Sequence, residues 1–324
     1  MAEVTIAHNH PFDPAYGYDL EKLLAVGAPE EPRDLAAFWQ HTYAQTLAVP
    51  PDLQAKEIAW ADPGVRAYEV TFASLGGFRV GGWMLTPRDR PPELLKVVGH
   101  GYGGREAPEL AADDAPVAAI FPVARGFGPS ARKELPGDSP RHVLHGIENR
   151  DTYLHRFCVA DIWAASTALV GQFPTAARRL CYTGGSFGGG IGAMALAWDR
   201  RFVAGVLDVP SFGNHPLRVT LPCVGSGEAV RLKFQRDPAV LATLAYFDAA
   251  VHARRIGTPV LFGCAKWDPA VPPPGQFAVH NAHQGRKELF VRTMAHFDHA
   301  VHTEESGRFE RAGVAWCRRW GSAV

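Results

Sequence analysis

Apolar runs of strand length alternate with longer segments of helical periodicity along most of the chain. Residues 32–47 carry apolar side chains at helical spacing, and Asp34 is placed to cap that helix. A second long helical segment covers residues 151–173, and a last one covers roughly residues 304–320. The strand-like runs, most of which end in glycine or in a polar turn, lie at 65–74, 78–87, 94–104, 115–128, 201–212, 257–269 and 287–299.

This order of elements predicts the fold class. Apolar strands that alternate with helices are typical of a mostly parallel central sheet with helices on both faces. The runs 65–74 and 78–87 are joined by Leu-Gly-Gly, which predicts a hairpin. No repeat, low-complexity tract or linker divides the chain, so we expect a single domain over residues 1–324, with residues 1–50 as an N-terminal extension and helix packed on it. Residues 213–256 are the least strand-like part, and we expect them to form helices over the site.

The stretch CYTGGSFGGG places Ser186 in a G-x-S-x-G pattern between a strand-like RRLCYT and a helix-like GIGAMALAW. A serine on such a sharp turn has a strained backbone, so Gly184 and Gly188 must leave room for the strand and the helix. The alternatives are a glycine-rich loop that packs a helix on a strand, or a phosphate cradle, which would need a lysine near the last glycines. No lysine stands there. The pattern favours a nucleophilic serine in an α/β-hydrolase fold.

An oxyanion that forms at such a serine needs backbone N–H donors. The residue after the serine, Phe187, offers one donor at the start of the helix. The turn GHGYGG follows the apolar run LLKVV, where the second donor of such enzymes stands, and the backbone N–H of Tyr102 is our candidate. The alternative for this stretch is an ordinary glycine turn with a structural His100.

A serine nucleophile also needs a base and a carboxylate that orients the base, and in this fold the chain order is Ser, acid, His. Asp268 stands on the turn after the apolar run PVLFGCA, and we favour it as the acid over the alternative of a turn-capping residue. Asp208 ends the preceding strand and is a weaker candidate, whereas Asp248 has the position of a residue on a helix face.

The strand ELFVRTM is followed by AHFDHAVH, which offers His296, His299 and His302 as bases. His296 comes first after the strand, where the catalytic loop should begin, so we favour it and keep His299 as the alternative. The H-x-x-H spacing also occurs in metal sites, but neither a Glu in an HExxH pattern nor a cysteine partner accompanies it. We therefore expect neither a metal nor an organic cofactor.

Composition narrows the class of partner. The 324 residues hold 33 Lys plus Arg and 33 Asp plus Glu, a balance that predicts no nucleic-acid or anionic-membrane partner. The first 20 residues lack the pattern of a signal peptide, and no apolar run approaches the about 18 residues of a membrane span. We expect a cytoplasmic protein with buried thiols, because the cysteines are odd in number and never in CxxC spacing: Cys158, Cys181, Cys223, Cys264 and Cys317.

Several motifs in one order resemble carbohydrate esterase family seven, the acetyl esterases that include acetyl xylan esterases and cephalosporin-C deacetylases. DLAAFW resembles the family's N-terminal helix, HGYGG its oxyanion turn, RGF its R-G-Q motif and DTYLHRFCVAD its D-T-Y-x-x-R…D helix. GGSFGGG is similar to the family's G-G-S-Q-G-G-G elbow. The stretches LATLAYFDAAVHARRIGTPVLFGCAKWDPAVPPP and GRKELFV are similar to the family's acid region and last strand.

The resemblance implies an α/β-hydrolase that deacetylates small esters such as acetylated carbohydrates or cephalosporins, and a homo-oligomer, commonly a hexamer. It implies Ser186 as nucleophile, Asp268 as acid and His296 as base, with the backbone N–H groups of Tyr102 and Phe187 in the oxyanion hole. The remaining alternatives are a peptidase of the prolyl-oligopeptidase type, a broader carboxylesterase of the same superfamily, and a non-catalytic scaffold with a decayed site.

The sequence departs from the family pattern near the expected site. Phe127 and Phe187 stand where the family has glutamines, so we expect Phe127 in the substrate pocket and a more apolar site with altered acyl or alcohol preference. The base loop reads MAHFDH where the family reads G-H-E, so His296 lies one residue closer to the strand. These departures concern the choice of substrate more than the type of reaction.

Overall fold

The computed structural model describes residues 7–109 and 116–322. Its strands form one nine-stranded sheet in the order β1-β2-β3-β5-β4-β6-β7-β8-β9. Strands β1, β2 and β3 are antiparallel to one another, β3 is antiparallel to β5, and the strands from β5 to β9 in that order are parallel. The strands are β1 (Gln54–Ile58), β2 (Val65–Ser74), β3 (Phe78–Pro87), β4 (Leu94–Val98), β5 (Val117–Pro122), β6 (Leu180–Gly185), β7 (Phe202–Asp208), β8 (Val260–Ala265) and β9 (Lys287–Arg292).

Helices of very different lengths connect and cover these strands. Short 3-10 turns lie at Leu75–Gly77, Gly128–Ser130, Pro174–Ala176 and Ala245–Phe247. The α-helices are α1 (Leu20–Leu24), α2 (Leu35–Leu47), α3 (Ser139–His142), α4 (Leu154–Gln172), α5 (Phe187–Leu196), α6 (His215–Arg218), α7 (Ser226–Arg236), α8 (Val240–Leu244), α9 (Ala249–Ala253), α10 (Pro273–Ala282) and α11 (Ala300–Gly321).

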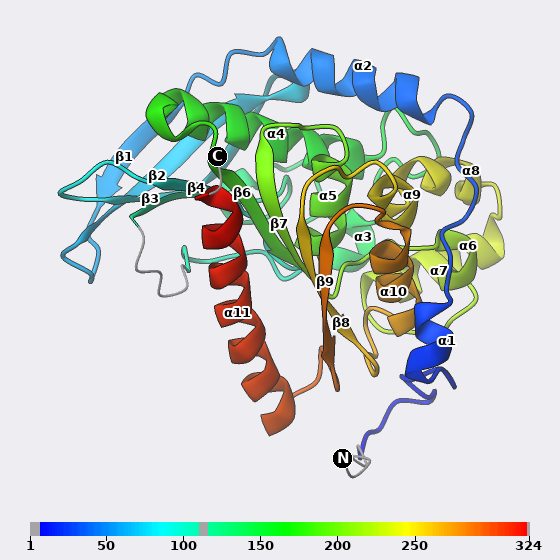
Figure 1. The fold of residues 1–324 in the computed structure, drawn as a ribbon. Coiled ribbons are helices and arrows are strands. Elements are labelled where there is room, and N and C mark those ends of the chain that lie inside the picture. The colour runs from blue at the N-terminus through cyan, green and yellow to red at the C-terminus, as the bar shows by residue number, and fades with distance from the viewer. Residues whose placement is uncertain (1–6, 110–115, 323–324) are drawn as a thin grey trace.

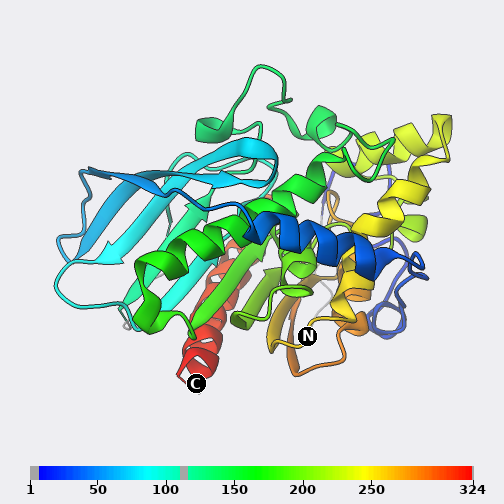
Figure 2. The ribbon, with the colours of Figure 1, turned by 90° about the horizontal axis from the view of Figure 1, so that it is seen from above.

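Helices cover both faces of the parallel part of the sheet (Figures 1 and 2). Helices α4, α5 and α10 pack on one face and α2 lies across α4, whereas α11 packs along β6 to β9 on the other face. The α11 side of the core includes Phe309, Trp316 and Cys317, which belong to one hydrophobic cluster with Val206 of β7. Strands β5 and β8 are buried along their whole length, as expected for parallel strands covered on both faces.

The fold class predicted from the sequence is confirmed. The hairpin strands end where the apolar pattern ends, at 65–74 and 78–87. The other predicted runs contain each strand together with its following turn, because apolar residues continue into the turns at the carboxyl edge of the sheet. The stretch 213–256 forms helices α6 to α9 as expected.

Three local details differ from the sequence prediction. Strand β1 was not predicted, because its mainly exposed residues QAKEI lack an apolar pattern and form only an edge of the sheet. Asp34 stands at the N-cap of α2, but its side chain does not cap the helix; it pairs with Arg150 at 2.7 Å and accepts a hydrogen bond from the Tyr246 hydroxyl. Helix α11 begins at Ala300, earlier than expected, since His299 caps it.

Candidate active site

Ser186 lies on the sharp turn between β6 and α5. Its backbone has φ 53° and ψ −115°, a strained conformation for a residue other than glycine. The turn is fixed by a hydrogen bond from the Ser186 N–H to the Asp208 carbonyl, 2.9 Å long. A Cβ atom on Gly184 or on Gly188 would lie 2.8 Å from backbone oxygen atoms, so both positions need glycine. The predicted strand–serine–helix turn is therefore present.

The imidazole of His296 lies between the serine and a carboxylate. Its Nε2 is 3.1 Å from Ser186 Oγ, and its Nδ1 is 2.8 Å from Asp268 Oδ2. A carboxylate only accepts, so Nδ1 donates to Asp268 and Nε2 keeps a lone pair for the serine proton. His296 has φ 50°, a left-handed conformation that brings the ring to the serine although the loop is short.

Asp268 is fully buried and held by its own loop. Its Oδ1 accepts hydrogen bonds from the backbone N–H groups of Ala270 and Val271, each 2.9 Å long. Its Oδ2 accepts a further one from Gln276 Nε2, also 2.9 Å long. Hydrogen bonds of this kind stabilise a charged carboxylate away from water and fix its orientation toward the imidazole.

Gln276 is a site residue that the sequence reasoning missed. Its side chain is fully buried in α10, and its Oε1 accepts from the backbone N–H of Ala265 at the end of β8. Gln276 therefore links the carboxylate of Asp268 to the strand that precedes it. No sequence signal marks this glutamine, because it follows the proline run of α10 and contacts the acid only in the folded chain.

The environment of His296 favours its charged form. Burial acts to lower the pKa of His296, but the charge of Asp268 and its hydrogen bond act in the opposite direction and raise the pKa above its usual range. This is the arrangement of a base that takes up a proton during a reaction, since the carboxylate stabilises the imidazolium that forms.

The alternative acids and bases have other partners. His299 Nδ1 accepts from the backbone N–H of Val301 and caps α11, and His302 Nδ1 lies 3.0 Å from Arg292 Nη2. Asp208 forms an ion pair with Arg292, and Asp248 caps α9 through its buried carboxylate. Of these candidates, only Asp268 and His296 form a hydrogen-bonded line to Ser186 Oγ.

The predicted oxyanion donors belong to neighbouring turns. Phe187 is the first residue of α5, and Tyr102 follows Gly101, which lines the cavity at Ser186. The aromatic rings of Tyr102 and Phe187 pack against each other at an interplanar angle of 34°, with centroids 4.3 Å apart. His100 is buried and accepts a hydrogen bond from the Ala124 N–H through Nε2, which ties the turn to the chain after β5. The donor roles of Tyr102 and Phe187 remain predictions.

The phenylalanines at the family's glutamine positions lie behind the turn. Phe187 is 3% exposed and Phe127 is 7% exposed. The Phe127 ring packs on the rings of His142 and His100, with centroids 4.8 and 6.2 Å away. A role of Phe127 in the substrate pocket remains a prediction, and its ring can act on the pocket through this aromatic layer.

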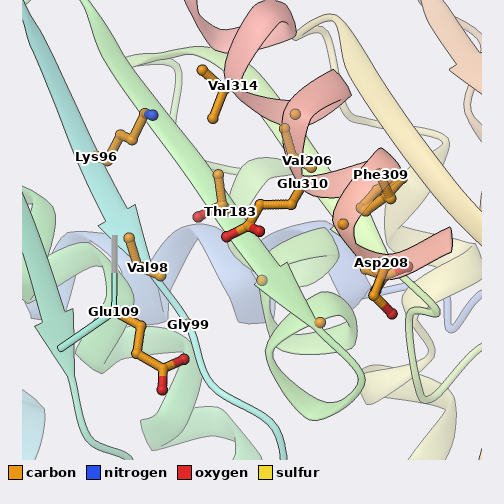
Figure 3. Close-up of a pocket in the computed structure, with 15 residues that line it drawn as sticks. Lys96, Val98, Gly99, Glu109, Thr183, Val206, Asp208, Phe309, Glu310 and Val314 are labelled. Atoms are coloured by element: carbon orange, nitrogen blue, oxygen red, sulfur yellow. The ribbon is translucent and has the colours of Figure 1, made fainter. Parts of the chain in front are cut away.

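A cavity of about 290 Å³ opens at Ser186 and His296. Asp208, Arg292 and His302 form a polar part of its wall, together with small residues such as Gly101. A groove of about 450 Å³ continues from it between α11 and strands β4, β6 and β7 (Figure 3). Its wall combines apolar side chains such as Val206 and Phe309 with the polar side chains of Lys96, Glu109, Thr183 and Glu310.

The N-terminal segment lies against the acid and base loops, which the sequence did not reveal. The carbonyl of Pro14 accepts a hydrogen bond from the backbone N–H of Asp268, 3.1 Å long. The rings of His8 and His10 lie 5.5 and 6.1 Å from Trp267, and Trp267 contacts Phe297 edge to face at 4.9 Å. The residues next to the acid and the base are thus packed together by a segment remote in sequence.

The described residues offer no other obvious chemistry. Within ranges 7–109 and 116–322, no group of three or more His, Cys, Asp or Glu side chains is placed to hold a metal ion. In the same ranges, none of the helices combines the length and the apolar character that a membrane crossing requires. All five cysteines lie within the described ranges, are buried and form no disulfide bond there.

A mostly parallel sheet with a serine on the β6–α5 turn, and an acid and a histidine on loops after later strands, defines the α/β-hydrolase class. Within this class, the chain belongs to the acetyl xylan esterase family, whose model matches residues 18–312. The curated acetyl esterase Axe7A of Xylanibacter ruminicola is 25% identical over 150 residues, which are 46% of this chain and 34% of that protein. The match thus spans about a third of the length of that relative.

Solved structures show the same fold. The acetyl xylan esterase from Paenibacillus sp. R4 superposes with a TM-score of 0.78 at 24% identity, over 91% of this chain and all of the other. Acetyl xylan esterase 1 from Thermoanaerobacterium sp. JW/SL YS485 superposes with a TM-score of 0.77 at 20% identity, over 92% of this chain and 98% of the other. A puromycin hydrolase gives 0.58 at 19% identity, with 82% of this chain on 41% of the other.

Proposed function

We propose that this protein is a serine esterase that hydrolyses small acetyl-type esters, with acetylated carbohydrates or cephalosporin-like compounds as substrates. The observation that carries the proposal is the continuous hydrogen-bonded line from Asp268 through His296 to Ser186, with distances of 2.8 and 3.1 Å. The match of the acetyl xylan esterase family model to residues 18–312 supports the ester class.

In the proposed reaction, Ser186 Oγ attacks the ester carbonyl while Nε2 of His296 takes the serine proton. Asp268 accepts the hydrogen bond from Nδ1, which holds the required tautomer and stabilises the imidazolium. The imidazolium then donates its proton to the leaving alcohol, and the acyl group stays on Ser186. A water molecule then attacks the acyl carbon while the same Nε2 takes a proton from it. The bond between the acyl carbon and Ser186 Oγ breaks, Nε2 returns the proton to Oγ, and the carboxylic acid, usually acetic acid, leaves.

The negative oxygen that forms on the carbonyl carbon would be bound by the backbone N–H groups of Tyr102 and Phe187. In comparable enzymes one such donor contributes roughly 3 kcal/mol to stabilisation of the transition state. Phe187 stands at the N-terminus of α5, where N–H groups without helical partners favour negative charge. The stack of the Tyr102 and Phe187 rings supports this assignment, because it keeps the two residues next to each other.

The polar wall of the cavity supports a substrate with a hydroxyl-rich alcohol part. Asp208, Arg292 and His302 line the cavity beside the serine, and the groove under α11 adds further polar side chains. Donors and acceptors of this kind can bind the hydroxyl groups of a substrate. A peptidase is the second candidate, but the superpositions with acetyl xylan esterases cover more of this chain, at higher TM-scores, than those with puromycin hydrolase.

We also propose a cytoplasmic location and a homo-oligomeric, hexameric assembly. The buried cysteines, which form no disulfide bond in the described part of the chain, support a reducing compartment. The assembly rests on the family resemblance, and sedimentation or light scattering measures it directly. As partners we propose small-molecule esters and neither nucleic acid nor a membrane, in line with the zero net charge.

The test is hydrolysis of p-nitrophenyl acetate by the wild type and by Ser186→Ala. We expect turnover by the wild type and its loss in the variant, with the same thermal unfolding in both. Undiminished activity in the variant contradicts the assignment, and inactivity of both proteins favours the scaffold alternative. A panel of acetylated xylose, cephalosporin C and p-nitrophenyl esters of longer acids then ranks the substrates.

A further inference from the structure

The hydroxyl of Tyr102 lies between two buried histidines. Tyr102 Oη is 2.8 Å from Nε2 of His155 and 3.2 Å from Nδ1 of His142. Both imidazoles are fully buried, and the other nitrogen of His142, Nε2, lies 2.8 Å from the carbonyl oxygen of Arg125. The side chain of the proposed oxyanion residue is therefore anchored in a polar chain inside the core.

Only one order of hydrogens satisfies every contact in this chain. The Arg125 carbonyl can only accept, so His142 Nε2 donates to it, and in a neutral ring Nδ1 of His142 is then an acceptor. Tyr102 has a single hydroxyl hydrogen, which His142 Nδ1 accepts. His155 Nε2 must then carry a hydrogen and donate it to Tyr102 Oη. Hydrogen-bond donation therefore runs from His155 to Tyr102, from Tyr102 to His142, and from His142 to the backbone carbonyl of Arg125.

Both histidines are neutral, as this order requires. Burial lowers the pKa of His142 to about 4, and burial lowers the pKa of His155 well below its usual range. Burial also raises the pKa of Tyr102, so its hydroxyl keeps its hydrogen. The Tyr102 hydroxyl and both nitrogens of His142 are paired in this chain, whereas Nδ1 of His155 is buried with no hydrogen-bond partner among the described residues. Linked hydrogen bonds of this kind orient the Tyr102 hydroxyl more firmly than a single contact does.

The chain connects elements that converge behind Ser186. His142 ends α3, His155 lies in the first turn of α4, Arg125 follows β5, and Tyr102 stands on the turn after β4. The Tyr102 ring also stacks on Phe187, the residue after the serine. Within the described ranges, no hydrogen bond of the chain reaches Ser186 or His296, and the residue beside the site that the two histidines bond to is Tyr102. The rings of His142 and His155 also lie edge to face with the Phe187 ring, with centroids 6.0 and 5.7 Å away.

We propose that His155 and His142 are positioning residues that fix the Tyr102 turn, and with it the backbone N–H that binds the oxyanion. This inference rests on the proposed esterase function. A donor that is fixed before the reaction stabilises the oxyanion without reorganisation, whereas a loose donor loses part of this effect. Loss of the chain therefore lowers kcat and leaves substrate binding almost unchanged.

The first experiment compares Tyr102→Phe with the wild type on p-nitrophenyl acetate. The substitution removes the hydroxyl and keeps the ring, the stack on Phe187 and the backbone N–H. We expect kcat to fall about tenfold while KM changes less than about twofold. The control is Tyr43→Phe in α2, away from the site. It removes a half-buried hydroxyl that is hydrogen-bonded to Asp199 at 3.2 Å, and its kcat should equal that of the wild type.

The second experiment tests whether His155 acts through the hydroxyl. His155→Phe keeps a buried ring and removes the donor, so we expect the same loss of kcat, and no further loss in the double variant with Tyr102→Phe. His155→Gln carries an N–H group near the position of Nε2 and should recover part of kcat. Inhibition by phenylboronic acid, whose adduct on serine mimics the tetrahedral intermediate, should weaken in parallel with kcat, whereas KM does not follow.

The outcomes separate this inference from the proposed function. An unchanged kcat in Tyr102→Phe, or additive losses in the double variant, overturns the positioning role while Ser186→Ala is still inactive. A wild type whose activity does not depend on Ser186 overturns the esterase function itself. A variant with a lower melting temperature but unchanged kcat shows that the chain stabilises the core only, and this also overturns the inference.

Discussion

Asp208 and Arg292 form an ion pair in the wall of the cavity at Ser186, with 2.6 Å between Asp208 Oδ2 and Arg292 Nη1. Asp208 ends β7 and Arg292 ends β9, and the arginine side chain is 1% exposed. Strand β7 lies next to β8, the strand that precedes Asp268, so Asp208 is a second carboxylate at the same edge of the sheet. Its partner here is the arginine, so the imidazole of His296 bonds to Asp268 instead.

The first prediction concerns this choice of acid. Asp268→Asn should lower kcat by about 10⁴, because an amide cannot hold the imidazole in the reactive tautomer. Asp208→Asn should keep kcat within about tenfold of the wild type, but destabilise the fold by about 2 kcal/mol since it leaves Arg292 buried without its charge partner. Steady-state kinetics and chemical denaturation of the two variants measure these effects. The reverse pattern of activities would identify Asp208 as the acid.

The second prediction separates the two histidines of the base loop. His296→Ala should be inactive, with kcat lowered by about 10⁴ or more. His299→Ala should keep its activity and lose about 1 kcal/mol of stability, because the imidazole accepts the Val301 N–H at the start of α11. Kinetics and thermal unfolding on the same preparations test both parts. An inactive His299→Ala with an active His296→Ala contradicts the assignment.

The third prediction is the pH dependence of the reaction. The mechanism needs neutral His296, and Asp268 outweighs the effect of burial and raises the pKa of His296 above its usual range. The ratio kcat/KM should therefore fall as the pH drops through this raised pKa, with a midpoint above the ordinary histidine value of about 6.5 and a tenfold loss per pH unit further down.

A titration of the His296 ring by NMR in the inactive Ser186→Ala variant provides an independent measurement. In Asp268→Asn the charge that raises the pKa is absent while burial remains, so the ring should titrate at a lower pH. A midpoint below 6.5 in the protein with Asp268 intact contradicts the described electrostatics.

The fourth prediction concerns the glycines of the elbow. In Gly188→Ala the new methyl group would lie 2.8 Å from the His100 carbonyl oxygen and must push the oxyanion turn away. We expect Gly188→Ala to lower the free energy of unfolding by about 2 kcal/mol and to remove most of the activity. Gly185→Ala is the matched control, since its methyl group would lie 3.7 Å from Asp208 Cβ, an ordinary contact. Equal melting temperatures of the two variants would show that the close approach has no such cost.

The local pattern of apolar and polar residues was sufficient to predict much of the fold of this protein. The period of the apolar residues predicts the hairpin, the parallel strands and the long helices, because burial on one or both faces acts on neighbouring residues in the chain. The turn that carries Ser186 is also a local feature. A serine at φ 53° between a strand and a helix needs small neighbours, so the glycines around Ser186 allow the turn to be predicted from the sequence. The order Ser186, Asp268, His296 follows from the order of the strands.

The tertiary structure decided which of several similar side chains meet. Asp268 and Asp208 both follow apolar strands, and His296 and His299 share one loop, but hydrogen bonds to Arg292 and to the start of α11 occupy the second member of each pair. Gln276 and the histidines around the Tyr102 hydroxyl carry no pattern, since their contacts join segments far apart in the chain. Sequence therefore determined the kind of site, whereas packing determined its members, because a hydrogen bond depends on distance and direction in space.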